Sequence, residues 1–205
     1  MTLIELPAGA RLVLASASPR RSELLRSVGL DFDVVPADID ESVQPGETPL
    51  EYVSRLSAEK AGVVAARVGS DVIVIAADTT VDVDGRILEK PMDDADARRM
   101  LRLLSGRTHL VHTGVTVSWF PETRARGTTT IVAETAVRFI ELDDRAIDWY
   151  LATGEHAGKA GAYGIQGTAG AFVERIDGSV TNVIGLPLAE TVALLAATVS
   201  STGSR

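Results

Sequence analysis

The first half of the chain alternates short apolar stretches with amphipathic ones, a pattern that predicts strands and helices in turn. Residues 12–15 read as a short buried strand, and residues 19–28 show helical spacing that stops at Gly29, a residue typical of helix ends. Residues 32–36 are a second predicted strand. Residues 72–77 are apolar without interruption, as in a central strand that is covered on both faces.

Two longer helices are marked by start signals. Thr48, the proline after it and Glu51 match an N-cap, a first-turn proline and a capping-box glutamate, so we expect a helix from there to about Arg67. Asp93 opens another helix, which is acidic in its first turn and basic later, as the helix dipole favours, and Gly106 follows its end. This half therefore predicts α/β structure.

The second half opens with two long β-rich stretches, residues 108–119 and 129–141. The polar segment 121–128 between them predicts a hairpin. Residues 143–151 have a helical pattern, and a glycine-rich stretch over 154–170 follows. The first half alternates strands with helices, whereas the second half begins with consecutive strands. Together they predict a mixed α and β fold.

The end of the chain adds a strand near residues 172–176 and a helix from about Pro187. The sequence shows no internal repeat and no linker long enough to separate two domains. We therefore expect one domain over residues 1–199 and a disordered tail over residues 200–205.

Composition narrows the class of protein. The 205 residues carry a formal net charge of −8 at pH 7, which disfavours nucleic-acid polymers and anionic membranes as partners, although a few cations focused in a cleft still suit a small anion. The chain has no cysteine, which excludes disulfides, thiolate nucleophiles and zinc–thiolate sites. No apolar run approaches the ~20 residues of a membrane span and no signal peptide is evident, so we expect a soluble cytoplasmic protein.

Serines and arginines cluster between the first predicted strand and the first predicted helix. Ser18 suits the N-cap, Pro19 suits the first helical position, and Ser16 precedes them. Arg20 and Arg21 fall in the first turn, where the helix dipole disfavours cations, and an anion bound at the helix end would explain them. A capped helix with two solvated arginines explains these residues equally well when they are taken alone.

Only three of the 20 basic residues are lysines, namely Lys60, Lys90 and Lys159. Lys60 lies at helical spacing from Val53 and Leu56, which places it on or beside a buried stripe, where an ammonium needs a partner. Lys90 precedes a proline that holds it extended. A compact ammonium is a good phosphate ligand. The alternative is that Lys60 reaches solvent from the edge of the stripe and that Lys90 is a loop cation.

Two carboxylates follow predicted strands. Asp78 stands where the apolar strand 72–77 is expected to end, and ligands of α/β sheets gather at the carboxyl ends of strands. The acidic stretch 38–41 (DIDE) follows the strand 32–36 and can supply a second carboxylate. Two carboxylates and substrate phosphates are the usual way to hold magnesium. The alternative role for Asp78 is to cap a turn.

The glycine-rich segment 159–167 permits close approach of the backbone to a ligand, and Gln166 within it has the amide needed to read a base edge. This signal is weak when it stands alone, because most glycine-rich loops are only loops. The chain contains no Walker A sequence, which disfavours chemistry at a γ-phosphate.

Eight segments recur in a recognisable order: residues 14–21 (LASASPRR), 40–41 (DE), 59–61 (EKA), 77–79 (ADT), 88–91 (LEKP), 104–109 (LSGRTH), 159–167 (KAGAYGIQG) and 185–188 (GLPL). Together they resemble the Maf family of septum-formation-inhibitor-like nucleotide pyrophosphatases over nearly the whole chain. The resemblance implies a strongly twisted mixed β-sheet with flanking helices and two lobes around a deep cleft, a fold shared with inosine-triphosphate pyrophosphatases. It also implies a divalent metal cation, Mg²⁺ or Mn²⁺, and a homodimer.

The resemblance also implies roles for individual residues. In the family, the aspartate matching Asp78 is taken as the general base, and residues matching Glu41, Lys60 and Lys90 surround the metal and the phosphates.

Three further positions separate two branches of the family. Residues matching Arg20, Thr79 and Gln166 distinguish the branch that acts on dTTP and UTP from the branch that acts on methylated guanosine triphosphate. This chain carries the dTTP/UTP set.

The resulting hypothesis is a pyrophosphatase that hydrolyses dTTP and UTP, or modified pyrimidine nucleotides, with a link to cell-division control and nucleotide-pool sanitation. Asp78 would activate the water and, with Glu41, hold the metal. Lys60 and Lys90 would stabilise phosphate charge, while the turn over residues 16–21 would bind the triphosphate.

Two other classes of protein stay open. One is a non-catalytic nucleotide-binding regulator that acts through partner contacts. The other is an RNA-contacting module, which the net charge and the 4% aromatic content disfavour.

Overall fold

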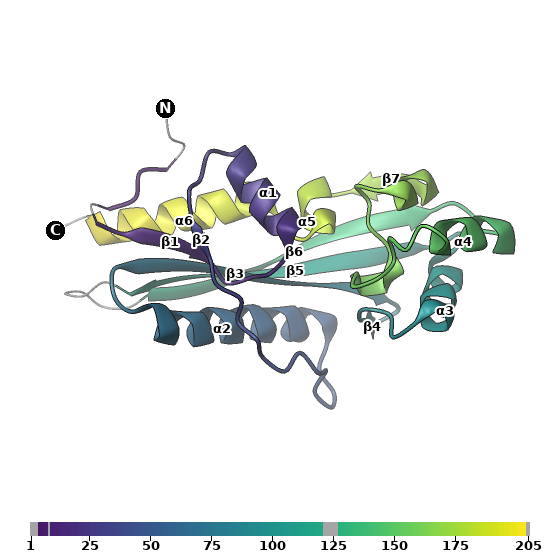
Figure 1. Ribbon diagram of the computed structural model, residues 1–205, viewed down its shortest axis with the longest axis horizontal. Coiled ribbons are helices and arrows are strands. Elements are labelled where there is room, and N and C mark those ends of the chain that lie inside the picture. Colours follow the sequence, from purple (N-terminus) through teal and green to yellow (C-terminus); the bar gives the residue numbers. More distant parts are fainter. Residues whose placement is uncertain (1–3, 8, 121–126, 204–205) are drawn as a thin grey trace.

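A seven-stranded mixed sheet forms the centre of the molecule (Figure 1). The computed structural model describes residues 4–7, 9–120 and 127–203. The strands are β1 (Arg11–Leu14), β2 (Asp33–Val34), β3 (Val72–Val83), β4 (Arg86–Leu88), β5 (Thr108–Phe120), β6 (Gly127–Phe139) and β7 (Val173–Asp177). The helices are α1 (Pro19–Ser27), α2 (Pro49–Val68), α3 (Asp94–Leu104), α4 (Asp144–Leu151), α5 (Val180–Ile184) and α6 (Leu188–Gly203), with the 3-10 helices η1 (Ala160–Ala162) and η2 (Thr168–Phe172).

The sheet combines parallel and antiparallel pairing. Its strands lie in the order β2-β1-β3-β5-β6-β7, and β4 pairs with β3 outside this path. Strand β1 is parallel to both β2 and β3, whereas the other pairs are antiparallel. A mixed sheet with flanking helices confirms the predicted fold class.

Strand β3 is longer than its apolar run, and the expectation that it ends before Asp78 is wrong. It continues to Val83 because β5 pairs with it along its length, as far as the register partners Asp82 and Leu110. The strand that ends here is β1, whose pairing with β3 stops at Leu14 and Ile75. The edge of β3 is then uncovered until β4 pairs with Val81. Asp78 lies in this uncovered stretch.

Helices cover both faces of the sheet, and the apolar core is divided between two lobes (Figure 1). In one lobe, α2 lies on one face, and α1 and α6 lie on the other. The core under α1 and α6 includes Leu14, Leu25, Ile75, Leu186 and Leu195. In the second lobe, α3, α4 and β7 surround another core, which includes Leu101, Leu104, Phe139, Tyr150 and Phe172.

Helix α2 begins as predicted and lies unusually close to the sheet. The capping box is present, since the Thr48 side chain accepts from the Glu51 backbone N–H and the Glu51 side chain accepts from the Thr48 backbone N–H. Gly114 on β5 permits the close approach, because a Cβ atom there would stand 2.2 Å from the carbonyl oxygen of Val53. Gly114 is also the register partner of Asp78, so the missing side chain brings α2 over that carboxylate.

The remaining differences from prediction are local. The strand expected over 32–36 is only two residues long, and α5 was not anticipated. Helix α6 continues to Gly203, into the expected tail, and residues 204–205 lie outside the described residues. The hairpin turn is also largely outside them, although β5 and β6 on either side pair antiparallel. Within the described ranges, no helix is long and apolar enough to cross a membrane.

Candidate active site

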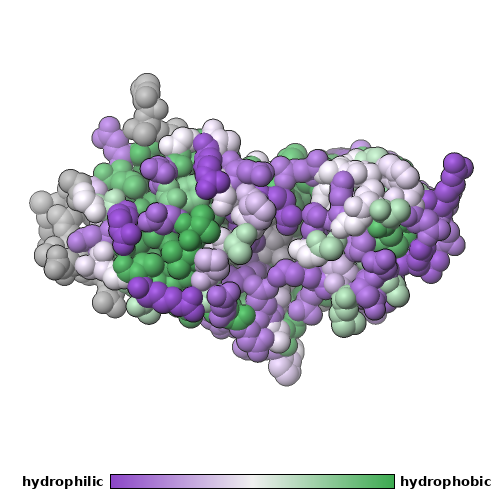
Figure 2. Space-filling view, in the orientation of Figure 1, coloured by the Kyte–Doolittle hydropathy of each residue, from purple (hydrophilic) through white to green (hydrophobic). Residues whose placement is uncertain are grey.

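A cleft of about 930 Å³ opens at the uncovered edge of β3, where segments from both lobes meet. Figure 2 shows hydrophilic side chains gathered around the middle of the molecule, between the two lobes. The cleft lining includes all the residues that the sequence named as site residues: Ser16, Ser18, Arg20, Arg21, Glu41, Lys60, Asp78, Thr79, Lys90 and Gln166. The fold therefore brings residues from well-separated segments of the chain to one cavity.

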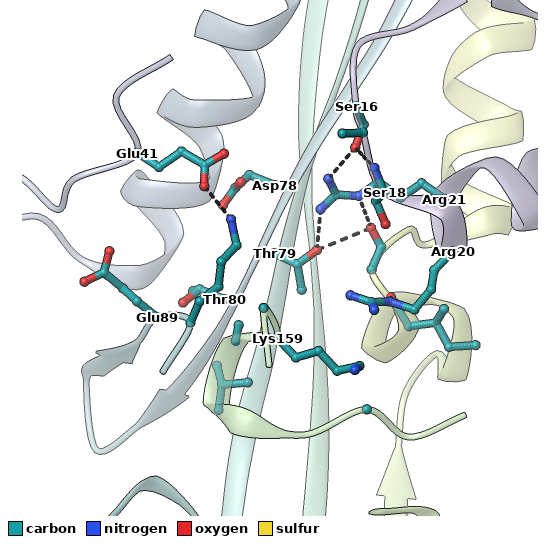
Figure 3. Close-up of a pocket in the computed structure, with 18 of the residues that line it drawn as sticks. Ser16, Ser18, Arg20, Arg21, Glu41, Asp78, Thr79, Thr80, Glu89 and Lys159 are labelled. Carbon is teal, nitrogen blue, oxygen red and sulfur yellow. Dashed lines mark hydrogen bonds and ion pairs between the residues drawn. The ribbon is translucent and has the colours of Figure 1, made fainter. Parts of the chain in front are cut away.

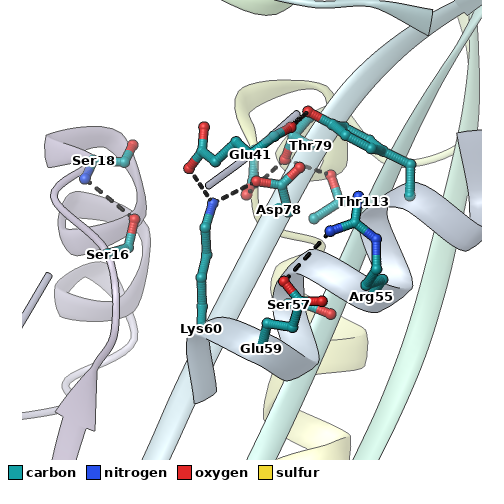
Figure 4. Close-up of polar contacts among 12 residues, drawn as sticks. Ser16, Ser18, Glu41, Arg55, Ser57, Glu59, Lys60, Asp78, Thr79 and Thr113 are labelled. Carbon is teal, nitrogen blue, oxygen red and sulfur yellow. Dashed lines mark hydrogen bonds and ion pairs between the residues drawn. The ribbon is translucent and has the colours of Figure 1, made fainter. Parts of the chain in front are cut away.

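Four charged side chains of the cleft form the ion-pair cluster: Glu41, Lys60, Asp78 and Lys90. The Lys60 ammonium lies 2.6 Å from Asp78 Oδ1 and 2.6 Å from Glu41 Oε1. The Lys90 ammonium lies 2.8 Å from Glu41 Oε2. Figure 4 shows Lys60 reaching from α2 to both carboxylates. Two cations thus balance two anions in direct contact.

Burial differs strongly within the ion-pair cluster. The side chains of Lys60 and Asp78 are 9% and 10% exposed, whereas that of Lys90 is 60% exposed. The prediction that Lys60 lies on the buried stripe of its helix is confirmed, and Asp78 provides the partner that burial demands. Burial acts to raise the pKa of Glu41, but hydrogen bonds from Lys60 and Lys90 outweigh it and lower that pKa to about 2. Glu41 is therefore ionised at neutral pH.

Side chains of α2 hold the loop that carries Glu41. Tyr52 Oη donates a hydrogen bond to the Glu41 carbonyl oxygen at 2.9 Å. Arg55 donates to the Ser42 carbonyl at 3.1 Å and forms an ion pair with Glu47 further along the loop. Asp40, the other acid of the pair, instead accepts hydrogen bonds from the Ser42 N–H and hydroxyl. Only Glu41 of these two acids lines the cleft.

The opposite wall of the cleft is the arginine side, which consists of Ser16, Arg20, Arg21, Thr79 and Lys159. Arg21 donates to Gly185 O at 2.8 Å, to Ser16 Oγ at 3.0 Å and to Thr79 Oγ1 at 3.1 Å (Figure 3). Arg20 donates to the Ile184 carbonyl at 3.4 Å. The alternative of two solvated arginines is therefore wrong for Arg21, which is anchored by residues from three segments.

Ser18 occupies the N-cap position of α1 as predicted, but its side chain makes no capping hydrogen bond. Its backbone N–H donates instead to Ser16 Oγ at 3.2 Å. The Ser16 hydroxyl thus accepts from both the start of α1 and Arg21, and it links the helix end to the guanidinium.

In the part of the chain that the structure describes, the cations of the arginine side donate to neutral groups. Among the described residues, no carboxylate forms an ion pair with Arg20, Arg21 or Lys159. Lys159 donates to the Glu155 carbonyl oxygen and points toward Arg20 (Figure 3). Burial lowers the pKa of Arg21, and burial followed by repulsion from Arg20 lowers the pKa of Lys159. Both cations would be stabilised by an anion in the cleft.

The glycine-rich loop brings Lys159 and Gln166 to the cleft. The Gln166 side chain is exposed at the lining. Gly164 lets the Lys159 side chain pass, because a Cβ atom there would stand 2.8 Å from Lys159 Cε. The Glu155 carboxylate ties the end of the loop by accepting from the Thr168 N–H and hydroxyl at 2.8 and 2.6 Å. The loop is therefore shaped around Lys159.

Residues 11–198 match the family described as Maf-like protein. The chain belongs to this family. It is 56% identical over 185 residues to a protein named dTTP/UTP pyrophosphatase from Anaeromyxobacter dehalogenans (strain 2CP-C), covering 90% of this chain and 92% of that protein. It is 50% identical over 191 residues to a protein of the same name from Hahella chejuensis (strain KCTC 2396), covering 92% of each. The Maf-like resemblance found from short segments is thereby confirmed.

Solved structures offer weaker similarity. A HAM1 protein from Coxiella burnetii matches with a TM-score of 0.44 and 17% identity, covering 94% of this chain and 99% of that one. A likeness of this size carries no argument about the Maf-like cleft.

Four residues in or around the cleft are not predicted as site residues by the sequence. Lys159 carries one available signal, its rarity as a lysine within a family segment. Tyr52 and Arg55 carry only a helical pattern, and Thr113 carries only a strand pattern. Their contacts with Glu41, Ser42 and Thr79 depend on how α2 and β5 pack, which no local pattern reports.

Proposed function

We propose that this Maf-like protein hydrolyses dTTP and UTP between the α- and β-phosphates, releasing the nucleoside monophosphate and pyrophosphate. The names of the two relatives support this activity, given their identity over nine tenths of the chain or more. The observation that carries the proposal is the ion-pair cluster in a cleft of nucleotide size, where Lys60 contacts the buried Asp78 carboxylate and also shares Glu41 with Lys90.

Asp78 is the proposed general base. Hydrolysis at the α-phosphorus needs a positioned water and removal of its proton as the pyrophosphate leaves in line. The Asp78 carboxylate stands at the uncovered edge of β3, where a ligand can approach it, and Lys60 holds its orientation. Lys60 and Lys90 would stabilise the charge that develops on the transferred and leaving phosphates.

A divalent cation, Mg²⁺ or Mn²⁺, is part of the proposal, with Asp78 and Glu41 as its protein ligands. The donors fit, because carboxylate oxygens are the ligands that these ions prefer and Glu41 is ionised at neutral pH. No group of three acidic or histidine side chains in the described part of the chain forms a metal site by itself. Substrate phosphates would therefore complete the coordination, and the bound ion would neutralise part of their charge.

The arginine side is the proposed binding surface for the triphosphate. Its guanidinium and ammonium groups have neutral partners, and the turn formed by Ser16 and Ser18 lies at the start of α1, which favours anions. Arg20, Thr79 and Gln166 are the proposed determinants of the pyrimidine. The Gln166 amide offers one acceptor and one donor, which complement the N3–H and a carbonyl of uracil or thymine.

A pyrophosphate-release assay tests the proposal. The purified protein is incubated with dTTP, UTP, CTP, ATP or GTP and Mg²⁺, and released pyrophosphate is measured. We expect release from dTTP and UTP above the other nucleotides. Binding without release would support the regulator, and binding of structured RNA without nucleotide turnover would support the RNA-contacting module.

Further parts of the proposal concern the cell. We propose a homodimer in the cytoplasm whose substrates include modified pyrimidine nucleotides, with a role in sanitising the nucleotide pool and a link to cell division. The absence of cysteine is in keeping with a reducing compartment such as the cytoplasm. Light scattering of the purified protein tests the dimer, and kcat/KM for 5-substituted pyrimidine nucleotides tests the substrate range.

A further inference from the structure

The hydroxyl of Thr79 is surrounded by protein groups. Its Oγ1 atom lies 3.1 Å from Arg21 Nη2, 2.9 Å from Thr113 Oγ1 and 3.3 Å from the Gly185 carbonyl oxygen. Thr113 is the register partner of Thr79 on β5 and is fully buried. Figure 4 shows the two threonines facing one another from neighbouring strands. A residue outside the cleft lining thus touches one of the proposed specificity residues.

Counting protons shows what the Thr79 hydroxyl can do. Thr113 Oγ1 also lies 3.3 Å from the Asn182 carbonyl, so each hydroxyl has two candidate acceptors for its single proton. Thr113 donates to Asn182 or to Thr79, and Thr79 donates to Thr113 or to Gly185, which leaves three arrangements because the two hydroxyls cannot donate to each other at once. In each of them the Thr79 proton is used within the protein. A base or a phosphate would have to displace one of these acceptors to receive that proton.

In all three arrangements Thr79 accepts a hydrogen bond from Arg21. The same guanidinium donates to Ser16 Oγ and Gly185 O, so three fixed acceptors set its plane. Guanidinium carries five N–H donors in a rigid fork, and those that the protein does not use are left to an anion in the cleft. A change in the Thr79 acceptor would turn or loosen this fork.

From this geometry we infer that Thr113 is a positioning residue for the phosphate site, acting through Thr79 on Arg21. We call the chain of contacts from Thr113 through Thr79 to Arg21 the hydroxyl relay. Thr113 limits Thr79 to rotamers in which the Thr79 hydroxyl oxygen faces Arg21. Thr79 then influences the substrate indirectly, through Arg21. The inference rests on the proposed function, in which Arg21 binds phosphate.

The test replaces Thr113 with residues of similar size. Thr113→Val removes the hydroxyl and should raise KM for UTP about three- to tenfold, the scale of one hydrogen bond, with a smaller change in kcat. Thr113→Ser keeps the hydroxyl and should remain close to wild type. The matched control is Thr116→Val on the same strand, since Thr116 is also fully buried and its hydroxyl bonds Ser57 and Thr130 away from the cleft. It should lose a similar amount of stability without a change in KM.

A double-mutant cycle with Arg21→Ala separates the hydroxyl relay from a general loosening of the strand. Once Arg21 is gone, Thr113→Val should have no further effect on substrate affinity, whereas independent effects would add. The same cycle is measured by calorimetry with inorganic pyrophosphate, so that it does not depend on turnover.

The outcomes are distinct. If the wild type binds pyrophosphate but releases none from any nucleotide, the proposed function is wrong, and the pyrophosphate cycle still decides the hydroxyl relay. Additive losses, or an unchanged affinity in a folded Thr113→Val variant, would overturn the relay. A wild type that binds no pyrophosphate would overturn the relay, and the release assay alone would then decide the proposed function.

Discussion

The two walls of the cleft handle charge in opposite ways. In the ion-pair cluster, both ammonium groups touch carboxylates at 2.6 to 2.8 Å. On the arginine side, the cations are held by hydroxyls and carbonyl oxygens, which fix their position without neutralising them. Since the whole chain carries a net charge of −8, this wall is a local exception to the sign of the molecule.

The difference separates two tasks that a phosphate-cleaving site must perform. A balanced cluster can hold a carboxylate ionised and oriented for proton transfer. An unbalanced wall draws an anion and gains from its arrival, because burial already disfavours the charge of Arg21 and Lys159. Changes in the ion-pair cluster should therefore act on kcat, and changes in the arginine side should act on KM.

The largest expected effect is that of Asp78→Asn. The amide keeps the shape of the carboxylate but cannot take a proton, so kcat should fall at least ~100-fold, as expected for the loss of a general base or a metal carboxylate. Affinity for pyrophosphate should stay near that of the wild type. Rapid-quench kinetics and calorimetry measure the two quantities. Substantial turnover in the folded variant would move the base elsewhere, with Glu41 the first residue to test.

Lys60→Met should lower kcat by ~10²–10³-fold, the usual result of removing one charge-stabilising donor. It should also lower stability, because Asp78 would be left buried without its partner, and breaking a buried pair typically costs ~3–5 kcal/mol. The double variant Lys60→Met/Asp78→Asn removes both charges and should recover most of that stability in urea unfolding. A single variant as stable as the wild type would show that the pair does not need both members.

Gln166→Glu should reduce kcat/KM for UTP and dTTP by ~1–3 kcal/mol of transition-state binding, the scale of a lost hydrogen bond with an unpaired polar group. A carboxylate cannot donate to a pyrimidine carbonyl, but it can accept from the N1–H and amino group of guanine. Any gain on GTP should be smaller, since Arg20 and Thr79 still line the site. An unchanged nucleotide profile would mean that Gln166 does not read the base.

Lys159→Met should raise KM about three- to tenfold with little change in kcat, as expected for the loss of one charged hydrogen-bond donor to phosphate. Gly164→Ala should move KM in the same direction, because the new Cβ atom would displace the Lys159 side chain. Arg138→Met is the matched control for the lost charge, since Arg138 pairs with Glu174 and does not line the cleft. An equal rise in KM in the control would point to net charge alone.

The smallest effect is the pH dependence of stability that Glu41 contributes. Its pKa is lowered from 4.5 to about 2, so the folded state favours the ionised form. The resulting stability is fully present above pH 4.5 and is lost as the pH falls toward 2. Urea unfolding of wild type and Glu41→Gln should therefore differ most near pH 6, and the gap should narrow by pH 3. If the difference in stability between wild type and Glu41→Gln stays constant from pH 6 to pH 3, the ionisation of Glu41 is not the source of that difference.

Local signals were enough for most of the long helices and strands and for the expected position of Lys60. The capping box that starts α2 lies within four residues, and the stripe that places Lys60 repeats every turn. Such patterns act between near neighbours, so they can be found without knowing the fold. The segments typical of Maf-like proteins added roles for Asp78, Glu41 and Lys90 that no periodicity contains.

Tertiary structure decided which groups touch. Asp78 was expected at a strand end, but pairing with β5 extends β3 through it, and the end of β1 creates the opening instead. Hydrogen bonds from α2 hold the loop in which Glu41, rather than Asp40, meets Lys60. Arg21 finds its acceptor at Gly185, 164 residues away. Contacts across such separations depend on sheet register and helix packing, which arise from the whole chain at once and leave no local pattern behind.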